Sequence, residues 1–237
     1  MDATEKRAAL AQIARAAGSC KDCELHQGRT HSVPGEGNPD AGIVFIGEGP
    51  GFYEDQQGRP FVGASGKFLD DLLRSIGLDR KTVFIANVVK CRPPNNRDPQ
   101  ADEIEACRKY LDGQLAAIAP KVVVTLGRHS MQRYFPGESI GRIHGQPRRK
   151  DDLIVVPMYH PAAALHQGSL RQVIEADFKR LPDFLSRALG GDLDGAGQRV
   201  PAHLRTRPES ASTPATAEAA PAPPESTQAE PQQMRLL

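Results

Sequence analysis

The chain has 237 residues, of which 39% are apolar and 25% charged. That is enough for one domain of about 150–200 residues with an extension. No apolar run approaches the roughly 18 residues of a membrane span, and the N-terminus has no apolar segment, so we expect neither a membrane protein nor an exported one. The net charge of +1 excludes a strongly basic, histone-like protein but not a local basic face. Four cysteines in a chain without an export signal indicate a metal or cluster site rather than disulfides.

Four short apolar runs predict buried β-strands. They are almost continuous in Val and Ile, which is typical of a sheet covered on both faces. Amphipathic stretches between and after them predict helices over Gly66–Ile76, from an N-cap at Asp98 to Ile118, and over Ser169–Ala188. The alternation predicts an α/β fold, a three-layer α/β/α domain with a central, mostly parallel four-stranded sheet. The predicted strands are Ile43–Gly47, Val83–Val89, Val122–Gly127 and Leu153–Met158.

The composition changes sharply near Leu189. Residues 190–237 contain seven prolines, many Ala, Ser, Thr and Glu, and no aromatic residue. Such a segment cannot bury enough apolar surface to offset the entropy that ordering it costs. We therefore predict a folded domain over residues 1–189 and a disordered, Pro- and Ala-rich tail over residues 190–237.

In parallel sheets the ligand site lies at the carboxyl ends of the strands, and unusual residues follow three of the predicted strands. Segment 47–68 has six glycines around Phe61, which indicates backbone close to a ligand or an ordinary flexible loop. Asn87 carries a planar amide that suits a nucleobase edge, or simply the polar groups of a loop. His160 ends the fourth strand and has either a chemical or a structural role. Leu165 then projects from a short loop, where it is exposed unless it wedges into a partner.

The cysteines form two pairs. Cys20 and Cys23 are a C-x2-C pair, whereas Cys91 and Cys107 are separated by fifteen residues. Zinc and iron–sulfur clusters both accept four Cys ligands, so the spacing alone does not choose the metal. The wide spread and the lack of a second C-x2-C pair favour a cluster. Unrelated core thiols beside a surface C-x2-C pair are the alternative.

Together, the segments GEGPGFYEDQQGRPFVGASG, NVVKCRPP and HPAAAL, with cysteines at these four places, resemble the family-4 uracil-DNA glycosylases. These are the [4Fe–4S]-containing members of the uracil-DNA glycosylase superfamily, and the resemblance covers roughly Cys20 to Leu185. It implies an enzyme that flips uracil out of DNA and hydrolyses its N-glycosidic bond, leaving an abasic site as the first step of base excision repair. It also implies a [4Fe–4S] cluster bound by Cys20, Cys23, Cys91 and Cys107.

The resemblance assigns a role to each motif residue. Gly49 lies in the segment that lines the sugar and the attacking water, and Glu48 and Glu54 are the candidates for orienting that water. Tyr53 and Glu54 are candidates for excluding the C5 methyl group of thymine. The resemblance further implies that Phe61 stacks on uracil and that Asn87 reads the edge of the base. It implies that His160 faces the uracil O2 atom and that Leu165 wedges into the DNA.

Two rival functions and several properties of the chain complete the expectations. One rival is a cluster-containing relative that traps the abasic sugar covalently, but the segment from Cys91 to Cys107 is compact and lacks the reactive His, and the similar Gly141–His144 lies elsewhere. The other is a DNA-binding module without catalysis, which the intact catalytic set argues against.

We expect a cytoplasmic, nucleoid-associated monomer. The final Gln233–Leu237 resembles segments that dock into the bacterial sliding clamp, which makes the clamp a second candidate partner.

Overall fold

The computed structural model describes residues 1–188. The predicted tail and its clamp-like Gln233–Leu237 segment lie outside the described residues, so both stay predictions. None of the helices in the described part has the length and apolar character that crossing a membrane requires. In chain order the helices are α1 (Ala3–Ser19), α2 (Leu25–Gly28), α3 (Phe52–Gln57), α4 (Ala64–Ser75), the 3-10 helix η1 (Pro94–Asn96), α5 (Ala101–Ile118), α6 (Arg128–Gln132), α7 (Ile140–Ile143), α8 (Ala163–His166) and α9 (Ser169–Ala188).

Six strands form one sheet in the order β1-β3-β2-β4-β6-β5. The four central strands are the four predicted ones, and they run parallel. The two edge strands pair antiparallel, so the prediction of a four-stranded sheet is wrong in strand number. Short edge strands without an apolar run are common because they discourage pairing with other chains, and hydrophobic patterning therefore misses them. The strands are β1 (Glu36–Gly37), β2 (Ile43–Gly47), β3 (Phe84–Asn87), β4 (Val122–Leu126), β5 (Arg148–Lys150) and β6 (Leu153–Met158).

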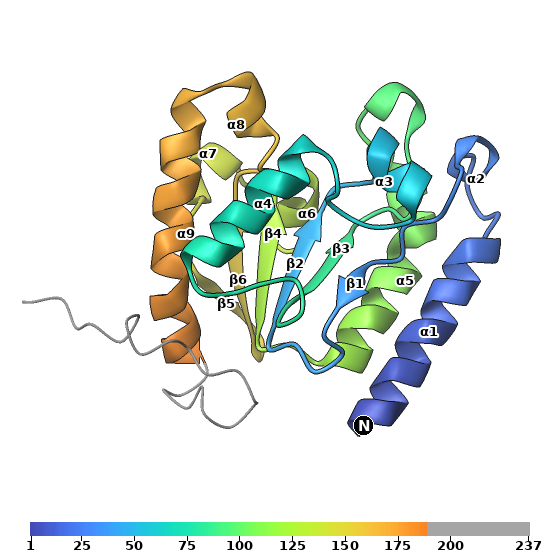
Figure 1. The fold of residues 1–237 in the computed structure, drawn as a ribbon, viewed down its shortest axis with the longest axis horizontal. Coiled ribbons are helices and arrows are strands. Elements are labelled where there is room, and N and C mark those ends of the chain that lie inside the picture. Colours follow the sequence, from blue (N-terminus) through green and yellow to red (C-terminus); the bar gives the residue numbers. More distant parts are fainter. Residues whose placement is uncertain (189–237) are drawn as a thin grey trace, which may run out of the picture. The chain divides into compact units, whose positions relative to one another are not determined.

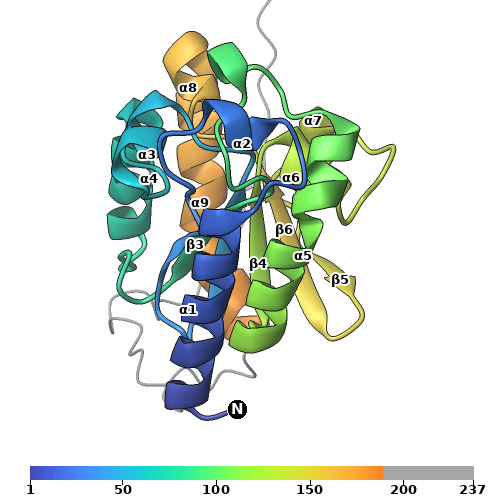
Figure 2. The ribbon, with the colours of Figure 1, turned by 90° about the vertical axis from the view of Figure 1, so that its right-hand side faces the viewer.

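Successive strand residues feed two hydrophobic cores on opposite faces of the sheet. Phe45 and Val124 pack in the core that α4 and α9 complete. Val44 and Val123 pack in the core that α1 and α5 complete. Figure 1 shows the sheet between these two helix pairs, and Figure 2 shows α1 and α5 from their outer side. The predicted three-layer α/β/α architecture is confirmed.

The start of α5 differs from the prediction. Gln100 is the N-cap, and its backbone N–H donates to the Glu103 carboxylate at 2.7 Å, as in a capping box. Asp98, the predicted N-cap, instead pairs with Arg128 at the start of α6. The prediction relied on the local Asp-Pro signal, whereas a long-range ion pair holds the carboxylate.

The strand order determines where a ligand can bind. The chain leaves β2 for β3 on one side and later passes over the sheet through α5 to β4 on the other side. Connections that diverge in this way open a crevice at the carboxyl ends of the strands. The segments after β2, β3, β4 and β6 all begin at that edge, where α3 and α8 lie in Figure 1.

Candidate active site and cysteine cluster

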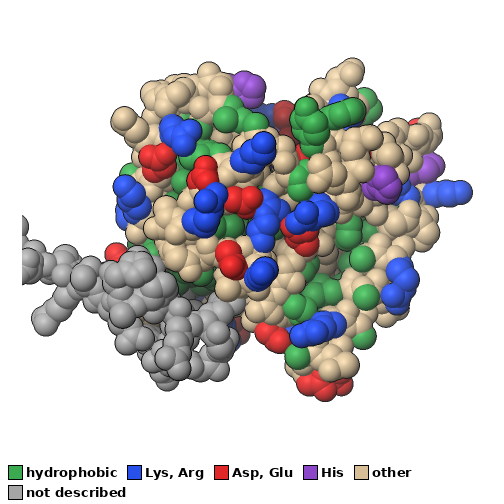
Figure 3. Space-filling model, in the orientation of Figure 1, with side chains coloured by type: hydrophobic (Ala, Val, Ile, Leu, Met, Phe, Trp, Pro, Cys, Tyr) green, Lys and Arg blue, Asp and Glu red, His purple; other side chains and the backbone are tan. Residues whose placement is uncertain are grey.

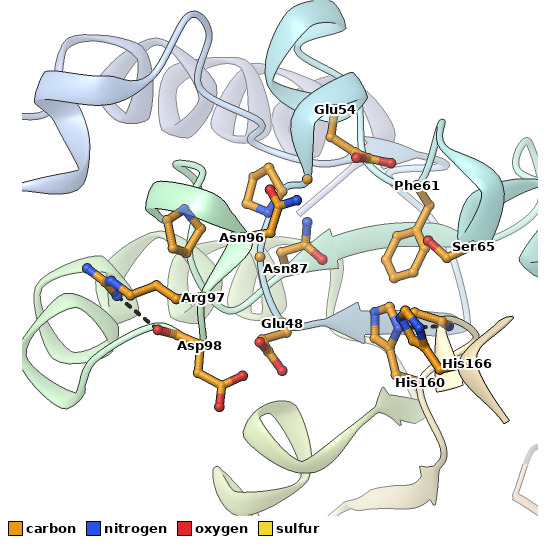
Figure 4. A pocket seen from close by; sticks show the side chains of 15 residues that line it. Glu48, Glu54, Phe61, Ser65, Asn87, Asn96, Arg97, Asp98, His160 and His166 are labelled. Atoms are coloured by element: carbon orange, nitrogen blue, oxygen red, sulfur yellow. Dashed lines mark hydrogen bonds between the residues drawn. The ribbon is translucent and has the colours of Figure 1, made fainter. Parts of the chain in front are cut away.

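A pocket of about 490 Å³ lies at the carboxyl edge of the sheet. Figure 3 shows the corresponding upper edge of the molecule as hollowed, and Figure 4 shows the pocket side chains. Segments far apart in the sequence meet there: the loop after β2, the end of β3 and the end of β6. Six residues predicted for the site line this pocket: Glu48, Gly49, Glu54, Phe61, Asn87 and His160.

Glycines allow the pocket residues to approach one another. A Cβ atom at Gly47 would lie 2.4 Å from Asn87 Oδ1 and 2.6 Å from Phe61 Cζ. A Cβ atom at Gly66 would lie 1.8 Å from the carbonyl oxygen of Phe61. No side chain fits at these two positions, so part of the glycine richness of segment 47–68 reflects close packing around Phe61.

Phe61 is buried and has a φ of 53°, a left-handed conformation that is strained for a bulky residue. Arg80 supports this backbone by donating to the carbonyl oxygens of Phe61 and Pro60. The Phe61 and His160 rings are nearly parallel, with centroids 5.5 Å apart and 24° between their planes, which is direct contact. The two rings therefore leave no room for a planar ligand between them.

His160 faces the pocket as a neutral imidazole. Enclosure by protein lowers its pKa to about 4, although the Glu54 charge acts in the opposite direction. The backbone N–H of Ala162 donates to His160 Nδ1 at 3.1 Å, so Nδ1 is an acceptor and carries no proton. The neutral ring then carries its proton on Nε2, which makes Nε2–H the hydrogen-bond donor.

Asn87 is almost fully buried at the end of β3. Among the described residues, its Oδ1 atom has no hydrogen-bond partner. A buried acceptor without a partner costs about 1–3 kcal/mol, so a bound group that donates to it is favoured. With the NH₂ group beside Oδ1, the amide is suited to a planar ligand edge that has one donor next to one acceptor.

Glu48 belongs to a cluster that no local pattern predicted. His129 Nε2 lies 3.7 Å from Glu48 Oε2 and 3.6 Å from Asp98 Oδ1. Burial and then the charge of Asp98 raise the pKa of Glu48 to about 7, while Arg128 acts in the opposite direction. Glu48 is therefore a carboxyl group that gains or loses its proton near neutral pH.

Glu54 has a structural task that Glu48 lacks. Its Oε1 atom accepts hydrogen bonds from the backbone N–H groups of Val62 and Gly63, both at 2.8 Å. The carboxylate thus ties α3 to the loop that follows Phe61. Tyr53, the other candidate for excluding a methyl group, is 60% exposed and is not among the residues that line the pocket.

Two further residues of α8 (Ala163–His166) lie at the pocket edge. Leu165 is 50% exposed, as expected of a side chain that projects towards a partner. Its neighbour His166 lines the pocket.

Several lining residues were missed by the sequence analysis, namely Ser65, Asn96, Arg97 and Asp98. Sequence position could have indicated Asn96, Arg97 and Asp98, because they come shortly after the motif NVVKCRPP at the end of β3.

The four cysteines line one small cavity at the second core, where Cys91 and Cys107 are buried. All four are free thiols. Arg29 donates to Cys91 Sγ at 3.1 Å, and the Lys90 backbone N–H donates to Cys107 Sγ at 3.2 Å. Such donors stabilise sulfur ligands of a metal or cluster.

Comparison with known proteins agrees with this geometry. The family model of the uracil DNA glycosylase superfamily matches residues 34–181. The chain is 54% identical to the type-4 uracil-DNA glycosylase of Sulfurisphaera tokodaii, over 69% of this chain and 79% of that protein. It is 46% identical to the type-4 enzyme of Archaeoglobus fulgidus, over 75% and 94% of the two chains. Similarity to the type-5 enzyme of Thermus thermophilus is lower, at 36% over 42% of this chain and 52% of that protein. The chain therefore belongs to the uracil-DNA glycosylase superfamily.

Proposed function

We propose that this protein is a type-4, monofunctional uracil-DNA glycosylase, which hydrolyses the bond between uracil and deoxyribose in DNA and leaves an abasic site. The main supporting observation is that one pocket contains both polar groups. These are the Asn87 Oδ1 acceptor, which is without a partner among the described residues, and the Nε2–H donor of His160. The identity to enzymes named type-4 uracil-DNA glycosylases supports the same activity.

Asn87 distinguishes uracil from cytosine. The N3–H group of uracil can donate to the orphan Oδ1, and uracil O4 can accept from the amide NH₂ group. Cytosine presents an acceptor at N3 and a donor at N4, so both contacts are reversed. A site built on such pairing rejects the wrong base because its own buried groups are then left unpaired.

Phe61 and Leu165 act on the flipped nucleotide and on the helix that it leaves. Extruding a base from a duplex costs a few kcal/mol. Stacking on the Phe61 ring recovers part of this, since base–aromatic stacking contributes about 1–3 kcal/mol. The exposed Leu165 on α8 is suited to fill the space vacated in the DNA stack.

His160 stabilises the leaving group. As the N-glycosidic bond breaks, positive charge develops on the sugar and negative charge on uracil O2. A neutral Nε2–H donor pointed at O2 stabilises this charge without transferring its proton, as in an oxyanion hole.

Glu48 orients the water that adds to the sugar. One oxygen of Glu54 already accepts two backbone hydrogen bonds, which leaves Glu48 as the freer carboxylate in the pocket. Its pKa of about 7 makes the carboxylate a base matched to neutral pH. Gly49, beside it, leaves room for the sugar and the water.

Cys20, Cys23, Cys91 and Cys107 would bind a [4Fe–4S] cluster, a fit supported by their number, their free thiols and the one small cavity that they line. When bound, the cluster supplies a structural cross-link, since hydrolysis consumes no electron.

The decisive experiment incubates the full-length protein with an oligonucleotide that contains one uracil and then cleaves abasic sites with alkali. We expect multiple turnovers on uracil and no product from matched oligonucleotides with cytosine or thymine. A complex with DNA that survives boiling detergent, with at most one turnover, would instead identify the covalent trap. His144, in the stretch that resembles the reactive segment of that relative, hydrogen-bonds Asp177 at 2.7 Å and does not line the pocket.

A further inference from the structure

Two aromatic side chains stand exposed beside the pocket. Phe52 and Tyr53 begin α3 and are 48% and 60% exposed. Their rings contact edge to face, with centroids 5.5 Å apart and 81° between the planes. Their chain neighbours Gly51 and Glu54 line the pocket, so the pair stands at its rim. Neither ring is needed for the hydrophobic cores.

A cation accompanies the rings. The Arg92 guanidinium lies 5.1 Å from the centroid of Phe52. Arg92 Nε donates to Asn96 Oδ1 at 2.7 Å, and Asn96 lines the pocket. Within the described part of the chain Arg92 forms no ion pair with a carboxylate, so its charge is available to an anionic ligand.

Exposed apolar residues are concentrated at this rim. Among the described residues, four large apolar side chains are exposed: Met1, Phe52, Tyr53 and Leu165. Three of these four flank one pocket, with Leu165 on the α8 side and the aromatic pair on the α3 side. Single exposed apolar residues need no explanation, but a group that flanks a binding pocket indicates a contact surface.

We propose that Phe52, Tyr53 and Arg92 form a stacking platform for the nucleobase next to the target uracil when that DNA strand is unpaired. The inference rests on the proposed function and extends it to substrate preference. Aromatic rings offer a face to any base, and a free guanidinium attracts the adjoining phosphate, which together suit single-stranded DNA. Inside a duplex the neighbouring base is paired and stacked on its other neighbour, and Leu165 is suited to fill the face that the flipped uracil leaves, so this base cannot use the platform.

The test measures binding of full-length, cluster-containing protein to oligonucleotides that carry 2′-fluoro-2′-deoxyuridine, which resists excision. Phe52→Ala should weaken binding to the single strand roughly 5- to 150-fold, the range that stacking of one base corresponds to. Binding to the fully paired duplex should change less than about 2-fold. Phe52→Trp should retain the single-strand affinity because it keeps an aromatic face.

A second arm removes the neighbouring base instead of the ring. An abasic spacer in place of the neighbouring base that the platform contacts should weaken binding by the wild-type protein. With this spacer present, Phe52→Ala should cause no further loss of affinity. Such non-additivity shows that the ring and the base contact each other. Phe135→Ala is the matched control, since Phe135 also lies under an Arg side chain, Arg148, but away from the pocket.

Three results would overturn the platform: unchanged single-strand affinity in Phe52→Ala, equal losses on single and double strands, or additive losses with the abasic spacer. Thermal unfolding, repeated with Phe52→Leu, separates these results from misfolding. Failure of the wild-type protein to excise normal uracil would reject the proposed function itself. Normal excision with an unaltered Phe52→Ala variant would reject only the platform.

Discussion

Arg80 binds Phe61 through the Phe61 backbone, by donating a hydrogen bond to its carbonyl oxygen, rather than through the Phe61 ring. The guanidinium also donates to the Pro60 carbonyl at 2.8 Å and pairs with Asp70 at 2.6 Å and Glu36 at 2.9 Å. A left-handed conformation of a bulky residue costs of order 1–3 kcal/mol. Arg80 offsets that strain and keeps the ring directed into the pocket.

Arg80→Ala should therefore lower kcat/KM for uracil excision about 10-fold or more, since a shift of about 1 Å in a positioned group can cost 100-fold. Arg74→Ala is the control, because Arg74 lies in the same region of the chain but makes exposed contacts, an ion pair with Asp71 and a hydrogen bond to the Asp70 carbonyl oxygen. Steady-state kinetics and thermal unfolding of both variants separate positioning from stability. A stable Arg80→Ala variant with wild-type kinetics would show that the Phe61 backbone needs no such support.

Replacing His160 should slow bond cleavage rather than binding. Loss of one donor to a developing oxyanion typically costs 10²- to 10³-fold in rate, and we expect His160→Ala to fall in that range under single-turnover conditions. Affinity for the uncleavable analogue should change far less. Because the pKa of His160 is about 4, the wild-type rate should show no loss as pH rises through 6.5. Such a loss would mean that a protonated imidazole acts instead.

Glu48 should impose its own pH dependence. With a pKa of about 7 it is protonated below neutrality and becomes a carboxylate above it. If the carboxylate orients water, the single-turnover rate rises between about pH 6 and 8, and Glu48→Gln is slow and flat across that range.

Asp98→Asn provides a sharper control on the same group. The negative charge of Asp98 raises the pKa of Glu48, so removing it should move the midpoint of the rate profile to lower pH. A profile that is unchanged in both Glu48→Gln and Asp98→Asn would assign the titration to another group.

The sequence was sufficient for the parallel core of the fold and for six of the residues that line the pocket. Each apolar run is a strand whose two faces are buried, and the carboxyl-edge rule then brings Asn87 and His160 together. The sequence could not predict the contacts of Asp98, because His129 lies 31 residues further along the chain and is brought close by the β4–α6 turn. Whether Glu54 serves catalysis or the loop was also undecidable, since the answer depends on which backbone N–H groups its carboxylate meets.

Asn87→Ala should abolish discrimination rather than general DNA binding. Uracil excision should fall at least about 100-fold, because the variant loses both hydrogen bonds to the base edge. Affinity for undamaged duplex should remain nearly constant, since it comes from phosphate contacts, and should keep its salt dependence. Parallel measurement of excision and of duplex binding checks this. Equal losses in the two assays would assign Asn87 to the scaffold.

One stretch of chain links the cysteine site to the pocket. Cys91 lies in the motif at the end of β3 and Cys107 lies on α5, and between them lie Pro93, Asn96 and Asp98, which line the pocket. Protein purified without oxygen should therefore contain four irons and four sulfides per chain. Cys107→Ser should lose the cluster, unfold at a lower temperature and lose excision together, because the pocket wall is no longer held.

Reduction of the wild-type cluster by dithionite should leave the excision rate unchanged, since the reaction consumes no electron. A colourless protein with stoichiometric zinc, or a rate that follows the redox state of the cluster, would contradict this structural role.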